Sequence, residues 1–182
     1  MRMQGKIGLV TAAGSGMGKA GAIRFAREGA SVSVVDINPE AVDAVVKEIK
    51  DAGGNAIGIV ADLTKDEESK RIVTETANRF EGLDFVWNHV GYPGPASIEG
   101  IEMKDFELTL DLNLRTILVT TEAALSEFRI RGGGSLLYTA SSSGLMGSGF
   151  SPVYSMAKFG VVGFVKALAK RVAKDNVRAN AI

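Results

Sequence analysis

The chain has 182 residues, 46% of them hydrophobic, which suits a single domain with one buried core. Its 21 basic and 21 acidic residues cancel, so no net charge attracts nucleic acid or an acidic membrane surface. The absence of cysteine excludes disulfides and thiolate metal sites, and no apolar run approaches the roughly 18 residues of a membrane span. Because Met1–Gly5 also lacks the apolar core of a signal peptide, we expect one cytoplasmic domain over residues 1–182.

Strand-like and helix-like runs alternate along the chain. Strands are expected near 6–11, 31–36, 55–61, 83–88, 134–139 and 177–182, and helices near 17–28, 39–52, 65–80, 103–129 and 153–174. This alternation predicts β–α–β units with right-handed crossovers, and hence an α/β fold with a doubly wound parallel sheet and helices on both faces. Ligands bind such sheets at the carboxyl ends of the strands, which is where Gly16, Asp36, Asn88 and Ser141 fall.

A glycine-rich turn follows the first strand. The run Ala12-Ala13-Gly14-Ser15-Gly16-Met17-Gly18 precedes an amphipathic helix. Strand, turn and helix in this order form a phosphate-binding arrangement, because glycines let the backbone approach a pyrophosphate and the helix amino end favours negative charge. A flexible glycine-rich connector is the alternative, since Lys19 stands where the G-x-G-x-x-G pattern has its third glycine.

Asp36 ends the second strand, about 20 residues after the glycine turn. An acid at this place can accept hydrogen bonds from an adenosine ribose, and its charge would repel a 2′-phosphate. No arginine follows it, since the next residues are Ile37 and Asn38. The sequence therefore favours NAD over NADP, although a strand-end turn or a helix cap before Pro39 would also use an acid here.

Tyr154 and Lys158 lie four residues apart in the helix expected over 153–174, so their side chains share one face. A phenol has a pKa of about 10, and a neighbouring ammonium favours the phenolate. The pair is therefore a candidate proton donor or acceptor near neutral pH, although a solvated helix face has the same pattern. Ser141, thirteen positions before Tyr154 at a strand end, could hydrogen-bond a substrate oxygen or belong to a polar turn.

Together these residues resemble the short-chain dehydrogenase/reductase family over the whole chain. Thr11–Gly18 is similar to the family's T-G-x-x-x-G-x-G loop, and Asn88-His89-Val90-Gly91 to its N-N-A-G segment. Asp62, in Ala61-Asp62-Leu63, matches the acid near the adenine ring. Asn113, Ser141, Tyr154 and Lys158 match the family's active-site tetrad.

The resemblance implies a Rossmann fold and an NAD-dependent oxidoreductase acting on a secondary alcohol or ketone. Tyr154 would exchange a proton with the substrate oxygen, and Ser141 would orient that oxygen. Lys158 would hold the nicotinamide ribose and lower the pKa of Tyr154, and Asn113 would hold a water that relays protons. The implied cofactor contacts are Thr11, Gly14, Ser15, Gly16, Met17, Gly18, Asp36, Ile37, Asp62, Leu63, Asn88, Gly91, Tyr154 and Lys158.

Three features depart from the family pattern. Ala12 replaces the first glycine, which would cost about 1 kcal/mol if the turn needs a positive φ there, unless Gly14 relieves it. His89 and Val90 replace the second Asn and the Ala of N-N-A-G. Because His89 is the only histidine and has no cysteine or nearby acid to join it, we expect no metal site and a structural histidine bonded to backbone.

The third departure is the ending, Val177–Ile182, which is similar to the family's sixth strand. Family members continue from there through a substrate-covering segment and a final strand. The resemblance thus implies that 1–182 is incomplete relative to the family and lacks the last strand or strands, either because the polypeptide is truncated or because the sequence is part of a longer chain. A non-catalytic NAD-binding or assembly module is therefore the alternative to an enzyme.

Substrate and partners are less constrained by the sequence. Apolar side chains expected around the reacting oxygen suggest a small-molecule alcohol or ketone: Tyr92, Leu145, Met146, Phe150 and Val153. The long helices near 103–129 and 153–174 carry apolar stripes, which in the family often form a homodimer or homotetramer interface. Packing against the sheet explains the same stripes.

Overall fold

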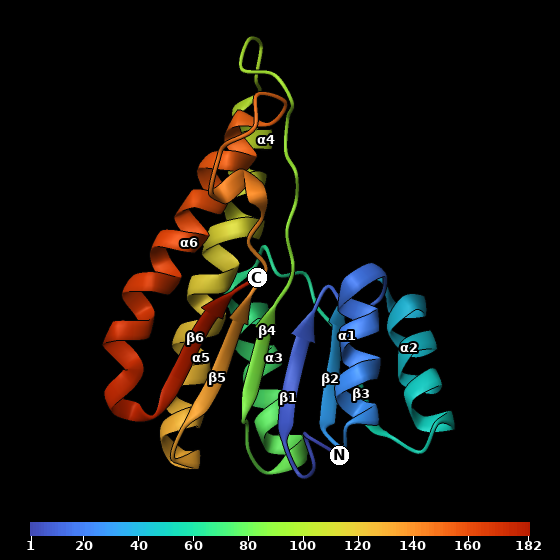
Figure 1. Cartoon of the computed structure of the whole chain (residues 1–182). Helices are drawn as coiled ribbons and strands as arrows, with labels where there is room; N and C mark the ends of the chain where they lie inside the picture. Colours follow the sequence, from blue (N-terminus) through green and yellow to red (C-terminus); the bar gives the residue numbers. More distant parts are fainter.

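The computed structural model describes all 182 residues and contains one sheet of six parallel strands, in the order β3-β2-β1-β4-β5-β6 (Figure 1). The chain reverses its direction of winding between β1 and β4, so a crevice is expected above the ends of these two strands. Each predicted strand is present to within two residues at either end. The strands are β1 (Ile7–Thr11), β2 (Ser31–Asp36), β3 (Asn55–Val60), β4 (Phe85–Asn88), β5 (Gly134–Tyr138) and β6 (Val177–Ala181).

Helices cover both faces of the sheet, as the alternating pattern predicted. Apolar side chains of α1 and α2 pack on one face, and those of α3, α5 and α6 pack on the other. Figure 1 shows this arrangement as a three-layer molecule. The helices are α1 (Gly16–Arg27), α2 (Pro39–Asp51), α3 (Asp66–Phe80), α4 (Met103–Leu110), α5 (Thr116–Arg131) and α6 (Pro152–Val172).

The helix predicted over 103–129 is interrupted. Between α4 and α5 the chain forms a π-helical turn, Asp111–Arg115, and the helix then continues to Arg131. Such a turn inserts an extra residue into the helical repeat and often occurs at functional sites. Its buried residue is Asn113, which is 1% exposed. The apolar periodicity that predicted the helix did not predict this change of geometry.

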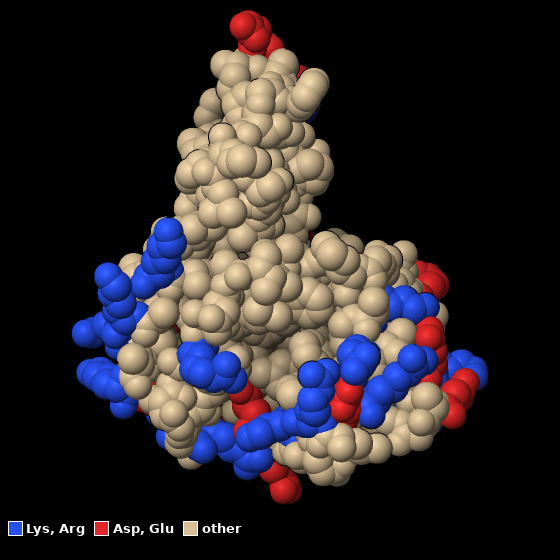
Figure 2. All heavy atoms as spheres, in the orientation of Figure 1, with Lys and Arg blue, Asp and Glu red and all other residues tan.

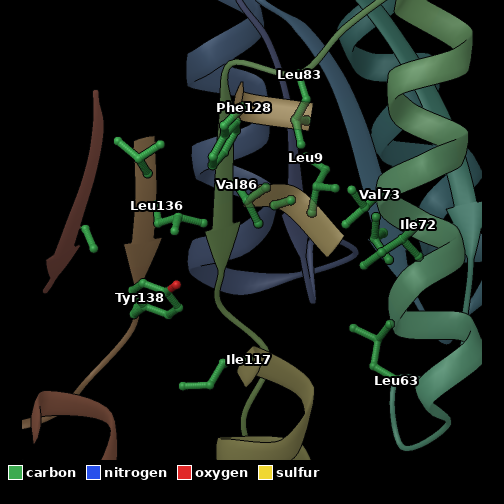
Figure 3. Close-up of a cluster of buried hydrophobic side chains, with 14 of the residues drawn as sticks. Leu9, Leu63, Ile72, Val73, Leu83, Val86, Ile117, Phe128, Leu136 and Tyr138 are labelled. Atoms are coloured by element: carbon green, nitrogen blue, oxygen red, sulfur yellow. The ribbon is translucent and has the colours of Figure 1, made fainter. Parts of the chain in front are cut away.

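The larger core lies between the sheet and the face formed by α3, α5 and α6. Figure 3 shows Leu9, Val86 and Leu136, which come from three adjacent strands and lie close to Phe128. Each such side chain contributes about 2 kcal/mol when it is fully buried. The Tyr138 hydroxyl is satisfied in this core by a 2.6 Å hydrogen bond with Thr121 Oγ1. This packing fixes the strands and so sets the positions of the loops at their carboxyl ends.

Those loops form a projection above the sheet. Figure 1 shows α4 and the adjoining turns of α5 and α6 extending beyond the carboxyl ends of the strands, beside the segment after β4 and the loop before α6. None of the helices combines the length and the apolar character needed to cross a membrane.

Candidate active site and dinucleotide crevice

The turn between β1 and α1 has an unusual backbone at two residues. Ala12 has a φ of +51° and Gly16 a φ of +53°. Gly18 is required by a close approach, because a Cβ atom there would overlap the carbonyl oxygen of Ala12. Gly14 has no positive φ and does not relieve the turn in that way. Instead, a Cβ atom on Gly14 would lie 2.9 Å from the Asp36 carboxylate.

Asp36 joins this turn to the end of β2. Its Oδ2 accepts a 2.9 Å hydrogen bond from the Gly14 N–H, and its Oδ1 accepts one of 3.2 Å from the Asn38 N–H. Asp36 is not the cap of α2, because Asn38 Oδ1 accepts from the Ala41 N–H instead. The first turn of α1 contains no acidic residue, which leaves its positive end available to an anion.

A cavity of about 380 Å³ opens beside Asp36. The structure brings four predicted cofactor contacts together in its wall, since Asp36, Ile37, Asp62 and Leu63 come from two different strand ends. The hydroxyl of Thr64 donates to Asp62 at 2.7 Å and, with Lys65, lowers the pKa of that carboxyl. The remaining lining residues are Ala12, Ala61, Thr64, Val90, Leu108 and Leu112. The exposed side chains of Ser15 and Met17 lie in the glycine turn outside this wall.

Two predicted contacts, Thr11 and Asn88, have buried side chains. Thr11 Oγ1 accepts from the N–H groups of His89 and Val90 at 2.9 and 3.0 Å, and so ties the end of β1 to the segment after β4. Asn88 is 1% exposed, and neither polar atom of its amide has a protein partner. The structure therefore places both side chains beneath the crevice rather than in its wall.

Tyr154 and Lys158 lie one turn apart at the start of α6, near Ser141 at the end of β5. Lys158 Nζ lies 5.4 Å from the centre of the Tyr154 ring and donates a 2.8 Å hydrogen bond to the Thr139 carbonyl. Ser141 begins a short 3₁₀ turn, and its Oγ accepts from the Ser143 N–H at 3.1 Å. The predicted hydroxyl, phenol and ammonium are thus gathered at one edge of the sheet.

Burial sets the protonation of this group. The Lys158 residue is 2% exposed, and desolvation lowers its pKa from 10.5 to about 8. Burial raises the pKa of Tyr154 above its usual 10, and the Ser141 hydroxyl opposes that rise. The lowered Tyr154 pKa expected from the neighbouring ammonium is not found, because desolvation of the phenol outweighs the other contributions.

Asn113 reaches this group through the π-helical turn. Its Nδ2 donates to the carbonyl oxygens of Tyr92 and Thr109 at 2.7 and 2.8 Å, whereas its buried Oδ1 has no protein partner. A Cβ atom on Gly91 would lie 2.9 Å from Asn113 Oδ1 and 3.4 Å from Lys158 Nζ. Gly91 therefore allows both polar atoms to approach the backbone closely, and a buried amide oxygen of this kind normally has a partner.

His89 differs from the prediction of a backbone-bonded histidine. Its Nδ1 lies 2.8 Å from the hydroxyl oxygen of Thr139, and its ring lies 4.9 Å from that of Trp87. Burial and the nearby Lys158 lower the pKa of His89. The sequence analysis did not predict a role for Thr139, although its place at the end of a predicted strand, two residues before Ser141, was a usable signal.

The apolar residues predicted around the reacting oxygen separate into two groups. Val153 is buried at the start of α6, whereas Leu145, Met146 and Phe150 are exposed in the loop before it. Leu145 lines a groove of about 610 Å³ together with Ser141 and residues of α6 and β6. A mostly apolar groove therefore borders Ser141.

The parallel sheet, the glycine turn and the crevice above β1 and β4 define a doubly wound α/β protein of the dinucleotide-binding class. The family model for the short chain dehydrogenases matches residues 6–182. An uncharacterized oxidoreductase of Thermotoga maritima is 35% identical over 182 residues, which cover 100% of this chain and 72% of the relative.

Solved structures agree with this match. A 7α-hydroxysteroid dehydrogenase complexed with NADH and 7-oxo glycochenodeoxycholic acid has a TM-score of 0.95 and 30% identity, covering 99% of this chain and 70% of that one. A short chain dehydrogenase from Burkholderia cenocepacia J2315 in complex with NADP has a TM-score of 0.94 and 29% identity, covering 100% and 74%. The chain belongs to the short chain dehydrogenase family of oxidoreductases, as its motifs predicted.

Proposed function

We propose that this single domain is an NAD(H)-dependent oxidoreductase that interconverts a secondary alcohol and a ketone. One observation carries the proposal: Ser141, Tyr154 and Lys158 gather at the sheet edge that also holds the glycine turn and the cavity beside Asp36. A bound nicotinamide would supply or accept the hydride. The relative with a bound 7-oxo steroid and NADH supports this class of substrate and cofactor.

The residues present fit such a cofactor. Gly16 faces open space at the turn, the positive end of α1 is free of acids, and Asp36 stands at the cavity wall. A carboxylate here would accept hydrogen bonds from the two hydroxyls of a ribose and repel a 2′-phosphate. We therefore assign the NAD preference to Asp36.

The protein's own groups would handle the proton. Because burial raises the pKa of Tyr154, its phenol is protonated at neutral pH, which is the form that donates to a ketone oxygen during reduction. Ser141 would hydrogen-bond the same oxygen where negative charge develops. Lys158 would hold the ribose, and Asn113 Oδ1, which has no protein partner, would accept from the water of a proton relay.

The experiment is the isosteric change Tyr154→Phe, with turnover measured over a panel of neutral secondary alcohols and ketones and with NADH binding measured by fluorescence titration. We expect turnover to be abolished and NADH affinity to be retained, because the ring stays and only the proton donor is lost. Substantial residual activity would refute the catalytic assignment. NADH binding without turnover in the unaltered protein would instead support the non-catalytic dinucleotide-binding alternative.

We also propose a homodimer or homotetramer formed through α4, α5 and α6. Exposed apolar side chains on these helices include Met103, Leu118 and Phe159, which are 59%, 56% and 47% exposed. Figure 2 shows that most charged side chains on the visible face lie around the base, while the projection carries almost none below its tip. Mass measurement by light scattering, for the protein and for Leu118→Glu, tests this proposal, since a charge in an apolar interface should yield monomers.

A further inference from the structure

Thr139 lies between the end of β5 and Ser141. Its carbonyl contacts the α6 side of the sheet, and its side chain contacts residues packed against α1 on the opposite side. Its carbonyl oxygen accepts the 2.8 Å hydrogen bond from Lys158 Nζ, on the α6 face. Its side-chain oxygen is joined by Trp87 Nε1 at 2.9 Å and His89 Nδ1 at 2.8 Å. Its N–H donates to the Asn88 carbonyl at 3.0 Å. Every polar atom of this residue is therefore engaged.

The direction of the hydrogen bonds follows from the donors. An indole N–H can only donate, so the Thr139 oxygen accepts from Trp87. The hydroxyl proton can then be donated to His89 Nδ1, which accepts in the tautomer that carries its proton on Nε2. A neutral His89 agrees with its lowered pKa, which burial and Lys158 both cause. In this tautomer the hydrogen bonds form an oriented chain from Trp87 through Thr139 to His89.

Both partners of the hydroxyl are themselves held firmly. Trp87 is 7% exposed, and a Cβ atom on Gly21 of α1 would overlap its ring. A Cβ atom on Gly18 would lie 2.9 Å from Cδ2 of His89. The two rings are thus wedged against α1, and the Thr139 side chain is fixed by groups that have little room to move.

We propose that Thr139 is a positioning residue for Lys158: Trp87 and His89 clamp its hydroxyl, and the clamp fixes the carbonyl that orients the buried ammonium. The inference rests on the proposed function, because that function gives Lys158 the role of holding the ribose. A buried ammonium without a carboxylate partner depends on neutral acceptors of fixed direction. The Thr139 carbonyl is the only protein acceptor within hydrogen-bond distance of Lys158 Nζ.

The test uses Thr139→Val, which keeps the shape of the side chain and removes its hydroxyl. Thr139→Ser restores the hydroxyl. Thr76→Val is the matched control, because Thr76 is a fully buried threonine in α3 whose hydroxyl bonds Ser33 and the Ile72 carbonyl and neither Thr139 nor Lys158. For each variant, kcat, KM, NADH affinity and the unfolding midpoint are measured, and Lys158 is titrated by ¹⁵N NMR of labelled lysine, with its signal assigned from Lys158→Met.

We expect Thr139→Val to lower kcat about fivefold to tenfold, the effect of one net hydrogen bond, with NADH affinity within about twofold. The pKa of Lys158 should fall further, since the carbonyl that accepts from its charged form is no longer held in place by the side chain. Thr139→Ser should restore both values. Thr76→Val should lose comparable stability while keeping kcat. His89→Phe should lower kcat in the same direction as Thr139→Val, and adding it to Thr139→Val should cost little more, since Thr139→Val already breaks the hydrogen bond to His89.

Three results would overturn the inference: an unchanged kcat and Lys158 titration in Thr139→Val, an equal loss in Thr139→Ser, or an equal loss in Thr76→Val. The proposed function fails separately, if the unaltered protein turns over no alcohol or ketone. In that case the Lys158 titration still tests the inference. A shift of the Lys158 pKa in Thr139→Val that Thr139→Ser reverses supports the clamp, and an unchanged pKa refutes it.

Discussion

The replacement Ala12→Gly tests the backbone of the glycine turn directly. Ala12 has a φ of +51°, in the left-handed region, where an L-residue with a Cβ atom costs roughly 1–2 kcal/mol. Glycine removes that strain but adds freedom to the unfolded chain, at about 0.4–1 kcal/mol, and loses part of a buried methyl, at up to about 0.5 kcal/mol. We therefore expect a net gain in the free energy of unfolding of about 0.5 kcal/mol.

The adjacent residue provides a matched control. Ala13 is fully buried and has no positive φ, so Ala13→Gly gains no relief of strain. It adds the same freedom to the unfolded chain and leaves a methyl-sized void, which together cost about 1.5 kcal/mol. Two neighbouring changes of identical chemistry should thus differ by about 2 kcal/mol and have opposite signs.

Urea unfolding followed by circular dichroism measures both variants, and the midpoint is compared at constant slope. For a chain of this length the gain at Ala12 corresponds to about 1–2 °C in Tm. If Ala12→Gly and Ala13→Gly destabilised the protein equally, the positive φ would carry no strain and the reasoning would fail.

Three further outcomes follow from the site. Burial lowers the pKa of Lys158 to about 8, so the folded protein holds this proton less tightly than the unfolded chain between pH 8 and 10.5, and stability should rise with pH there. Relative to Lys158→Met, the unaltered protein should gain about 2 kcal/mol between pH 7.5 and 9.5 in urea titrations, and parallel curves would contradict this. Asp36→Asn, which keeps an acceptor for the turn, should lower the preference for NADH over NADPH about tenfold in fluorescence titrations; an unchanged ratio would remove Asp36 as the discriminator. Gly18→Ala should lower the unfolding midpoint and weaken NADH binding, because its methyl meets the backbone oxygen of Ala12, and retention of both would show that the turn adjusts.

The sheet could be predicted from the sequence because its signals are local. Alternation of strand and helix patterns fixed six strands, and the Gly-rich run and Asp36 marked two neighbouring strand ends. Parallel strands bring those ends to one edge, so the cavity beside Asp36 followed from topology. The same argument placed Ser141 at that edge, whereas its grouping with Tyr154 and Lys158 came from the family resemblance.

What the sequence did not predict depends on contacts between distant segments. The Thr139 hydroxyl meets Trp87 and His89, which are 52 and 50 residues away in the chain. The pKa of Tyr154 depends on how deeply α6 packs, and burial reversed the direction expected from Lys158 alone. The π-helical turn at Asp111–Arg115 was not predicted either, because the apolar spacing was interpreted as one continuous helix.

The carboxyl edge of the sheet concentrates features that cost stability. It carries the left-handed Ala12, a buried ammonium on Lys158 without a carboxylate, and an unpartnered amide oxygen on Asn113. At the opposite edge, by contrast, the carboxylate of Asp84 is bonded by Lys6 and by a backbone N–H. Strained and desolvated groups persist where a ligand site requires them. Substitutions that remove the buried charge of Lys158 or the unpartnered oxygen of Asn113 should therefore stabilise the fold and lower turnover together. Ala12 lies outside the proton-transfer group, so removing its backbone strain should stabilise the fold without loss of turnover.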